Sequence, residues 1–257
     1  MTRRKRPTGA RSVTGKRNRR AAPGPGEAKP RRWETSLIAT LCVVAAVRVC
    51  LFSATFPFFN NIDEQNHVDL VLKYARGYWP REPVERIDFA TGRLLALYAT
   101  FEYLSPPERF RGGVFPRPLW ERPAGADRVW EGAALWAQRI NDEAHSPPVY
   151  YAVAGAWYRL GGWLGLSGGR QLYWVRFLNV PLCAMLVSCA YLFCRDGYSD
   201  RPELRLGVPI LVAFLPQDIF YSISSDVLSP FLFAASLCVL LAWYRSEERR
   251  VGKECRL

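Results

Sequence analysis

Long apolar runs recur along the chain and are separated by polar stretches. The first run, residues 37–56 ("LIATLCVVAAVRVCLFSATF"), is long enough to cross the ~30 Å hydrocarbon core of a bilayer as a helix. Arg48 interrupts it near enough to one end for its side chain to reach the interface. This pattern predicts an all-α, multi-pass transmembrane protein with roughly four to five membrane helices. Further apolar stretches lie at about residues 148–166, 173–194, 207–223 and 227–244.

A long polar loop, residues 57–147, separates the first apolar run from the second. It holds thirteen acidic and eleven basic residues, and a loop of this length can be translocated whatever its charge, so we expect it on the external side. Two pieces, residues 62–77 and 129–143, have helical patterns. The first suits a helix lying along the membrane surface. Its apolar side chains share one face: Val68, Val71, Leu72 and Ala75.

The positive charge of the chain is concentrated at the N-terminus. Residues 1–32 contain twelve Lys and Arg against one acid, Glu27, whereas residues 33–244 are close to neutral. Such a segment cannot bury a core, so we expect a disordered cytoplasmic tail that fixes membrane topology. Binding of RNA or anionic lipid is the alternative for the tail. The remaining region has no basic surface that would indicate a nucleic-acid partner.

The last residues, 245–257 ("RSEERRVGKECRL"), differ abruptly in character from the apolar run before them. Residues 245–256 resemble the in-frame translation of a common sequencing adapter. A short basic cytoplasmic tail is the alternative. The adapter interpretation predicts that the natural product departs from this sequence near Tyr244, and that the chain is a fragment of a longer protein.

The first candidate site directly follows the first apolar run, in "NNIDEQNH". A carboxylate of Asp63 or Glu64 at the membrane boundary could deprotonate an acceptor hydroxyl, or bind a divalent metal that does so. His67, four residues after Asp63, is a candidate second ligand for that metal. The alternative is structural, with Asn61 capping a helix and Glu64 completing a capping box.

Three further ionisable residues stand beside or within apolar segments. His145 precedes the second apolar run in "NDEAHSPPVYY", where a polar loop next to an aromatic belt is the structural alternative. Arg176 in "YWVRFLNVP" and Asp226 in "YSISSDVLSP" are costly if they face lipid, which makes each a functional candidate. A position at the water boundary would remove that cost.

Four segments in order resemble the N-terminal half of the GT-C membrane glycosyltransferases. They are "PFFNNIDEQNH", "HSPPVYYAVAGAWYRLGG", "VRFLNVPL" and "FLPQDIFYSISSDVLSP", and the likeness covers residues 37–244. It is similar in particular to the branch related to dolichyl-phosphate-mannose protein mannosyltransferases and to uncharacterised bacterial relatives. Each motif is short, and their order and spacing carry the resemblance.

The resemblance implies an inverting sugar transfer on the external face of a bacterial inner membrane. The donor would be a sugar linked to a polyprenyl phosphate or pyrophosphate, drawn from the membrane lipid. A one-step displacement needs a base opposite the leaving group and a cation or metal beside the departing phosphate. It does not need the carboxylate nucleophile of retaining glycosidases.

The resemblance also implies roles for individual residues. Asp63 corresponds to the acid of the first external loop, a base or metal partner, and Glu64 to its acidic neighbour. Arg176 matches an arginine near the donor phosphate, and Asp226 an acid after the third or fourth crossing. His145 matches the histidine of a His-Pro-Pro element. Here a serine separates that histidine from the prolines, which departs from the family pattern.

Two questions stay open at the level of sequence. A transporter or lipid-handling membrane protein is the rival function, and an internal repeat with interrupted helices would favour it. The side of the membrane that holds Asp226 depends on residues 148–166. If every apolar run crosses, Asp226 lies on the cytoplasmic side, away from Asp63. If residues 148–166 lie along the surface, both acids are external.

Overall fold

In the computed structural model, the regular elements of the described residues are all helices, joined by loops and turns. The prediction of an all-α fold is confirmed for these residues, in which a single isolated bridge joins Arg86 to Ile140. The expected disordered tail falls outside them, except for Arg32, which opens the first helix. The described residues are 32–59, 63–82, 84–99, 105–122, 125–215 and 218–254.

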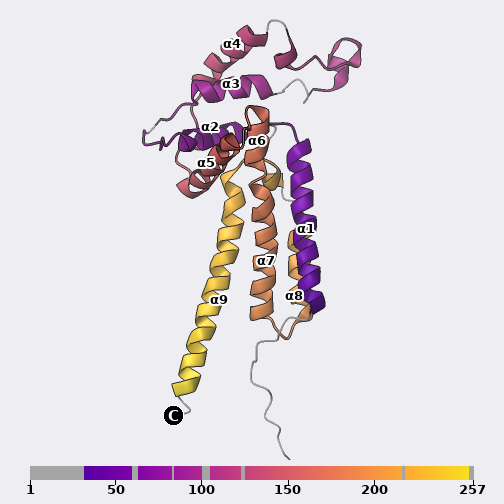
Figure 1. Cartoon of the computed structure of the whole chain (residues 1–257), viewed down its shortest axis with the longest axis vertical. Helices are drawn as coiled ribbons and strands as arrows, with labels where there is room; N and C mark the ends of the chain where they lie inside the picture. Colours follow the sequence, from indigo (N-terminus) through magenta and orange to yellow (C-terminus); the bar gives the residue numbers. More distant parts are fainter. Residues whose placement is uncertain are drawn as a thin grey trace, which may run out of the picture.

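Four helices run side by side along the long axis of the molecule (Figure 1). They are α1 (Arg32–Thr55), α7 (Asn179–Gly197), α8 (Pro202–Phe214) and α9 (Leu228–Glu254). The short helix α6 (Gly169–Arg176) leads into α7 at one end of this bundle. The beginning of α1, the turn between α7 and α8, and the end of α9 lie at the other end.

Among the described residues, three helical segments are long and apolar enough to cross a membrane. Apolar side chains on the outside of these helices are exposed, including Val47 and Leu51 of α1 and Phe233 of α9. Exposed apolar surface of this extent is expected where lipid tails surround a helix. The segments are Arg32–Thr55, Gly169–Gly197 and Ser225–Glu248.

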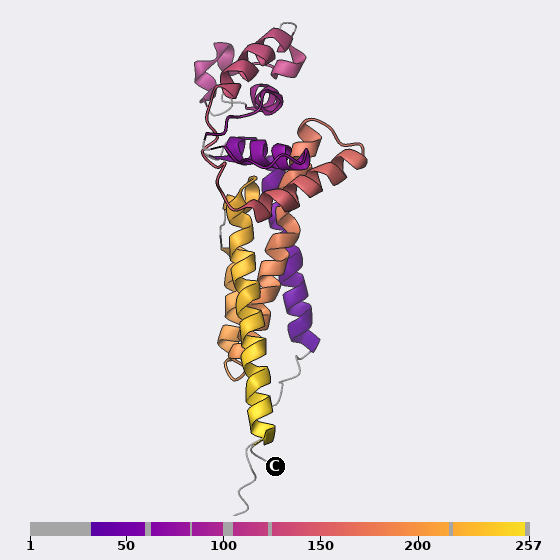
Figure 2. The ribbon, with the colours of Figure 1, turned by 90° about the vertical axis from the view of Figure 1, so that its left-hand side faces the viewer.

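The other two apolar runs form shorter helices. α5 (Pro148–Trp163) has 16 residues and α8 has 13, fewer than the ~20 that a straight span needs. α8 nevertheless stands within the bundle beside α1 and α7. α5 does not. It slopes across the bundle axis beneath α2 (Glu64–Ala75), as Figure 2 shows.

The predicted polar loop forms a helical cap at one end of the bundle (Figures 1 and 2). α2 and α5 make its lower layer, and α3 (Phe89–Tyr98) packs with α4 (Gly125–Ala137) farther from the bundle. Three 3-10 turns lie between α3 and α4. α4 corresponds to the helix expected at residues 129–143, but it begins and ends earlier in the sequence. The sequence analysis did not predict α3. The turns are η2 (Pro107–Arg109), η3 (Arg111–Gly113) and η4 (Leu119–Glu121).

The prediction that α2 lies on the membrane surface is wrong. Nine of its twelve residues are buried, because α5 covers one side and polar residues of neighbouring loops cover another. Contact with α5 is close at Gly155, where an added Cβ would stand 2.9 Å from the backbone nitrogen of Ala75. The apolar face seen in the sequence is a core face rather than a lipid face.

α5 has the pattern of an interfacial helix instead. One face, with Tyr151 and Ala154, is buried against α2, and the opposite face exposes apolar side chains. A helix with one buried face and one exposed apolar face is typical of helices at a bilayer boundary. With α5 across the axis, the chain returns to the capped end before α9. Asp226, in the turn directly before α9, and Asp63 both act electrostatically on His67 of α2. The exposed apolar residues are Val149, Val153, Leu160 and Trp163.

Candidate functional site

A buried ion pair fixes the connection between α1 and α2. Arg176, at the end of α6, donates from Nε and Nη2 to the two carboxylate oxygens of Glu64, at 2.8 and 2.7 Å. Its remaining N–H groups donate to backbone oxygens at the end of α1, so all five donors have partners. These acceptors are Ser53 (3.2 Å), Phe56 (2.7 Å) and Pro57 (2.9 Å).

Glu64 is saturated in the same way. Besides the two bonds from Arg176, its carboxylate accepts the backbone N–H of Phe59 at 2.7 Å and that of Ile223 at 3.0 Å. The guanidinium also lies over the ring of Phe58, 4.4 Å from its centre. The pair therefore ties α1, α2, α6 and the segment before α9 into one unit. Neither side chain has an unused hydrogen-bonding position in this arrangement.

Asp63, next to this pair, is exposed. It precedes the first residue of α2, and its backbone oxygen accepts N–H groups from Asn66 and His67 at 2.9 and 3.2 Å. Its side chain makes no capping hydrogen bond. Glu64 occupies the first helical position rather than the third, so the expected capping box does not form around it, and Asn61 lies outside the described residues. The Asp63 side chain is thus exposed to solvent, while its backbone is held by hydrogen bonds from the first turn of α2.

His67 lies one turn farther along α2 and is buried. Its Nδ1 is 2.8 Å from the hydroxyl of Tyr151 on α5. Burial lowers the pKa of His67 below its usual 6.5, against the opposing charges of Glu143, Asp226 and Asp63. The imidazole is therefore neutral at neutral pH. Acids from three separate segments act electrostatically on this one buried ring.

Asp226 reaches this group from η6 (Ser225–Val227), the turn that precedes α9, and is exposed. Burial raises the pKa of the Tyr151 hydroxyl, and the neighbouring hydroxyls of Ser225 and of Ser146, before α5, oppose that rise. The sequence left open whether Asp63 and Asp226 lie on the same side of the membrane. In the fold, both act electrostatically on His67.

The segment before α5 contributes a residue that sequence reasoning did not select. Glu143 is half-buried and accepts a hydrogen bond from Ser146. Among the acids that raise the pKa of His67 against the effect of burial, it has the largest effect. His145, the predicted site residue two positions later, is exposed. The only sequence signal for Glu143 was its position beside His145.

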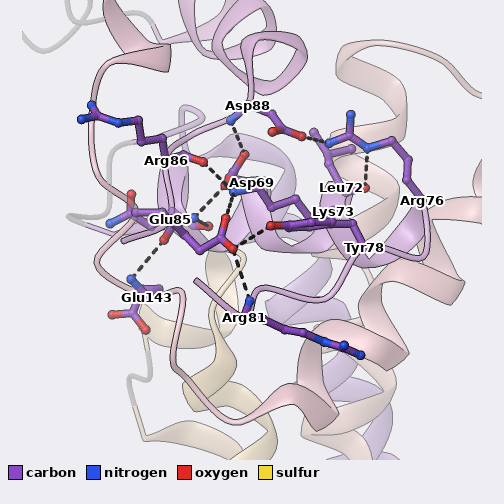
Figure 3. Close-up of polar contacts among 12 residues, drawn as sticks. Asp69, Leu72, Lys73, Arg76, Tyr78, Arg81, Glu85, Arg86, Asp88 and Glu143 are labelled. Carbon is purple, nitrogen blue, oxygen red and sulfur yellow. Dashed lines mark hydrogen bonds and ion pairs between the residues drawn. The ribbon is translucent and has the colours of Figure 1, made fainter. Parts of the chain in front are cut away.

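A second buried polar network holds that segment in place (Figure 3). Asp69 of α2 bonds to Lys73 and to the side-chain amide of Asn141, both at 2.8 Å, and to the backbone N–H of Asp88 at 2.9 Å. Lys73 also donates to the backbone oxygen of Arg86 at 2.6 Å. Because its charges are paired and hydrogen-bonded, this network is structural.

Asn141 links the network to the candidate site. Its side-chain oxygen accepts the backbone N–H of Glu143 at 3.0 Å, while its amide donates to the backbone oxygen of Asn66 at 3.1 Å. The loop that carries Glu143 is thereby fastened to the turn of α2 that carries His67. The one trace of this network in the sequence was the four-residue spacing of Asp69 and Lys73.

The expected metal ligands, Asp63 and His67, are not part of a larger ligand cluster. Within the ranges that the structure describes, no group of three or more His, Cys, Asp and Glu side chains is close enough to hold an ion. The Nδ1 atom of His67 is engaged with Tyr151. A divalent metal at this pair stays a prediction, and we derive no chemical step through it.

Searches against protein-family models, curated proteins and solved structures found no match for this chain. The case for a function therefore stands on the sequence resemblance and on the geometry of the capped end.

Proposed function

We propose that the chain is a GT-C-type glycosyltransferase that moves a sugar from a polyprenyl-phosphate-linked donor to an acceptor at the capped end of the bundle. The observation that carries the proposal is the exposed carboxylate of Asp63, one residue away from the saturated pair of Glu64 and Arg176. The backbone of Asp63 is held at the start of α2, and its carboxylate makes no capping hydrogen bond. A general base needs both a defined position and an accessible carboxylate.

In the proposed step, an acceptor hydroxyl oxygen attacks the anomeric carbon as the bond from that carbon to the phosphate oxygen breaks. The polyprenyl phosphate leaves with the bonding electrons, and Asp63 takes the acceptor proton. A single displacement inverts the anomeric centre. Asp226, exposed at the same end, is assigned to binding sugar or acceptor hydroxyls, and His145 to the outer edge of the same surface.

The roles of Glu64 and Arg176 in this proposal differ from the roles that the resemblance implies. Arg176 would need a free donor to hold a phosphate, and all of its donors are used within the fold. We therefore assign both residues to positioning Asp63. Their contribution to transfer would act through the placement of the loop after α1.

The proposed topology has the N-terminus in the cytoplasm of a bacterial cell and the cap outside the inner membrane. In this topology α8, extended by the turns that follow it, is a fourth membrane crossing. The direction of crossing then alternates along the chain through α1, α7, α8 and α9. The basic N-terminal segment supports this orientation, because Lys and Arg favour the cytoplasmic side. α5 would lie in the outer interface, where a lipid-linked donor and a water-side acceptor can meet.

Reconstituted vesicles test the proposal. The protein would be incubated with a synthetic radiolabelled polyprenyl-phosphate sugar, supplied in either leaflet, together with candidate acceptors. We expect release of polyprenyl phosphate and a product of inverted configuration when donor and acceptor are on the side of the cap. Movement of intact donor between leaflets without cleavage would instead support the transporter or lipid-handling alternative.

A further inference from the structure

A pocket of about 390 Å³ lies within the cap, away from the candidate site. It is lined by α2, α3, α4 and α5, and it lies at the C-terminal half of α2, near Leu72 and Arg76. Asp63 precedes the other end of that helix, about 13 Å away along the helix axis at 1.5 Å per residue. The volume falls in the range of small-molecule sites in proteins.

The walls of the pocket are mostly aliphatic. An apolar cavity of this size with a few polar groups at its edge is the usual form of a ligand site. Tyr158 of α5 and Ala90 of α3 complete the wall. The aliphatic side chains come from three helices: Leu72, Leu94, Leu97 and Val129.

The charged groups of the lining are both positive. They are Arg76 of α2 and Arg93 of α3, and none of the lining residues is acidic. Arg93 is exposed. Arg76 pairs with Asp88 at the rim (Figure 3), but their side chains are 50% and 38% exposed, and a pair this open is held weakly. Arg76 and Tyr158 both line the pocket.

From this combination we infer a binding site for an amphiphilic anion, a molecule with an apolar chain and one carboxylate or phosphate group. The chain would lie among Leu72, Leu94 and Leu97, and the anion would face Arg93 and Arg76. This chemistry has two sources, a free alkyl anion in solution or a phospholipid of the adjacent bilayer. The site does not depend on the proposed sugar transfer.

Calorimetric titration of the full chain in phosphatidylcholine nanodiscs tests the inference, with octyl phosphate as the probe and empty nanodiscs as the blank. We expect saturable binding of one equivalent. Octanol and inorganic phosphate should each bind at least about tenfold more weakly, because each keeps only one half of the complementary chemistry. Equal binding of octyl phosphate and octanol, or only the partitioning seen in empty nanodiscs, would overturn the inference.

Variants locate the site. Arg93→Gln should weaken octyl phosphate about tenfold, the scale of one charge-assisted hydrogen bond. Arg128→Gln, the matched control, removes the same charge from an exposed position on α4 outside the lining and should leave affinity unchanged. Ala90→Phe, at an exposed lining position, should block binding without disturbing the core. Equal losses of octyl phosphate affinity in Arg93→Gln and Arg128→Gln would show that general surface charge causes the effect, and would contradict the proposed site.

Nanodiscs that contain phosphatidylglycerol separate the two sources. If bilayer lipid occupies the pocket, the apparent affinity for octyl phosphate falls in these nanodiscs, and Arg93→Gln removes the difference. If the natural ligand is a free amphiphile, the affinity is the same in both. Either result supports an anionic site. If the affinity for octyl phosphate falls in phosphatidylglycerol nanodiscs even in Arg93→Gln, the lipid competes at another place, and this result would contradict the proposed site.

Discussion

Arg176 and Asp63 show how burial divides two ionisable residues that look alike in sequence. Both stand at the edge of an apolar run, where each is a functional candidate. Arg176 is withdrawn into the fold and uses its five donors there, whereas Asp63 stays exposed with no capping bond. A buried ion pair of this kind holds only if all its hydrogen bonds are made, since desolvation of two charges is costly.

Loss of one partner of this pair should therefore destabilise the protein strongly. Arg176→Gln leaves Glu64 buried without its cation, at an expected cost of about 3–5 kcal/mol. The measurement is the thermal unfolding midpoint in detergent. Arg170→Gln, on the exposed side of the same helix, is the control and should behave like the wild type. Equal midpoints for both variants would show that the pair does not hold the loop.

His67 gives the stability of the cap a dependence on pH. Its pKa is lowered by burial, so below about pH 6.5 the unfolded chain takes up a proton more readily than the folded protein. Stability should be full above that pH and fall as the pH decreases through it. Thermal midpoints measured from neutral pH down to about pH 5 should decline more steeply for the wild type than for His67→Gln. Parallel slopes would refute this role for the imidazole.

At the scale of elements, composition was enough to predict the long helices and not the cap. α1, α7 and α9 follow from apolar runs, because a helix of that length and hydropathy has few alternatives. The face of α2 was misassigned because its burial comes from residues distant in sequence, such as Asn141 and Gly155. α3 escaped notice although Asp88, a favoured N-cap residue type, precedes it, because Thr91 and Gly92 near its start are poor helix formers.

Close packing of α5 on α2 is a specific requirement of the cap. Gly155→Leu would force a side chain into the backbone of α2, where even a Cβ would lie 2.9 Å from the nitrogen of Ala75. Overpacking of this kind costs about 1–3 kcal/mol or more. The next residue, Ala156, faces outward, so Ala156→Leu is the control and should be neutral. Thermal midpoints of the two variants check this, and equal midpoints would mean that the helices are not in contact there.

At the scale of the whole molecule, one end carries the cap, and the other carries the start of α1 and the end of α9 (Figure 1). The opposite end is tied by an ion pair between Glu34 of α1 and Arg205 of α8, at 2.8 Å. Sequence reasoning could not choose the side of Asp226, since the answer depended on whether α5 crosses. That Asp63 and Asp226 both act on His67 is thus a result of the fold, while the sequence alone had marked each of them as a candidate.

The two ends should be accessible from opposite sides of the membrane. A single cysteine in a cysteine-free background would be placed at exposed Asp142 in the cap or at exposed Ser199 between α7 and α8. With an impermeant maleimide on intact spheroplasts, we expect labelling of Asp142→Cys at once and of Ser199→Cys only after permeabilisation. Labelling of both variants in intact spheroplasts would contradict the proposed topology.

The most direct test of the central claim is sugar transfer by Asp63→Asn beside the wild type. Asp142→Asn is the matched control, because it makes the same change at another exposed acid of the cap. We predict that Asp63→Asn inserts and unfolds like the wild type, since its side chain makes no capping bond, yet loses about 10²–10⁴-fold in transfer rate, as removal of a general base does. Asp142→Asn should keep its rate. Undiminished transfer by Asp63→Asn would contradict the account.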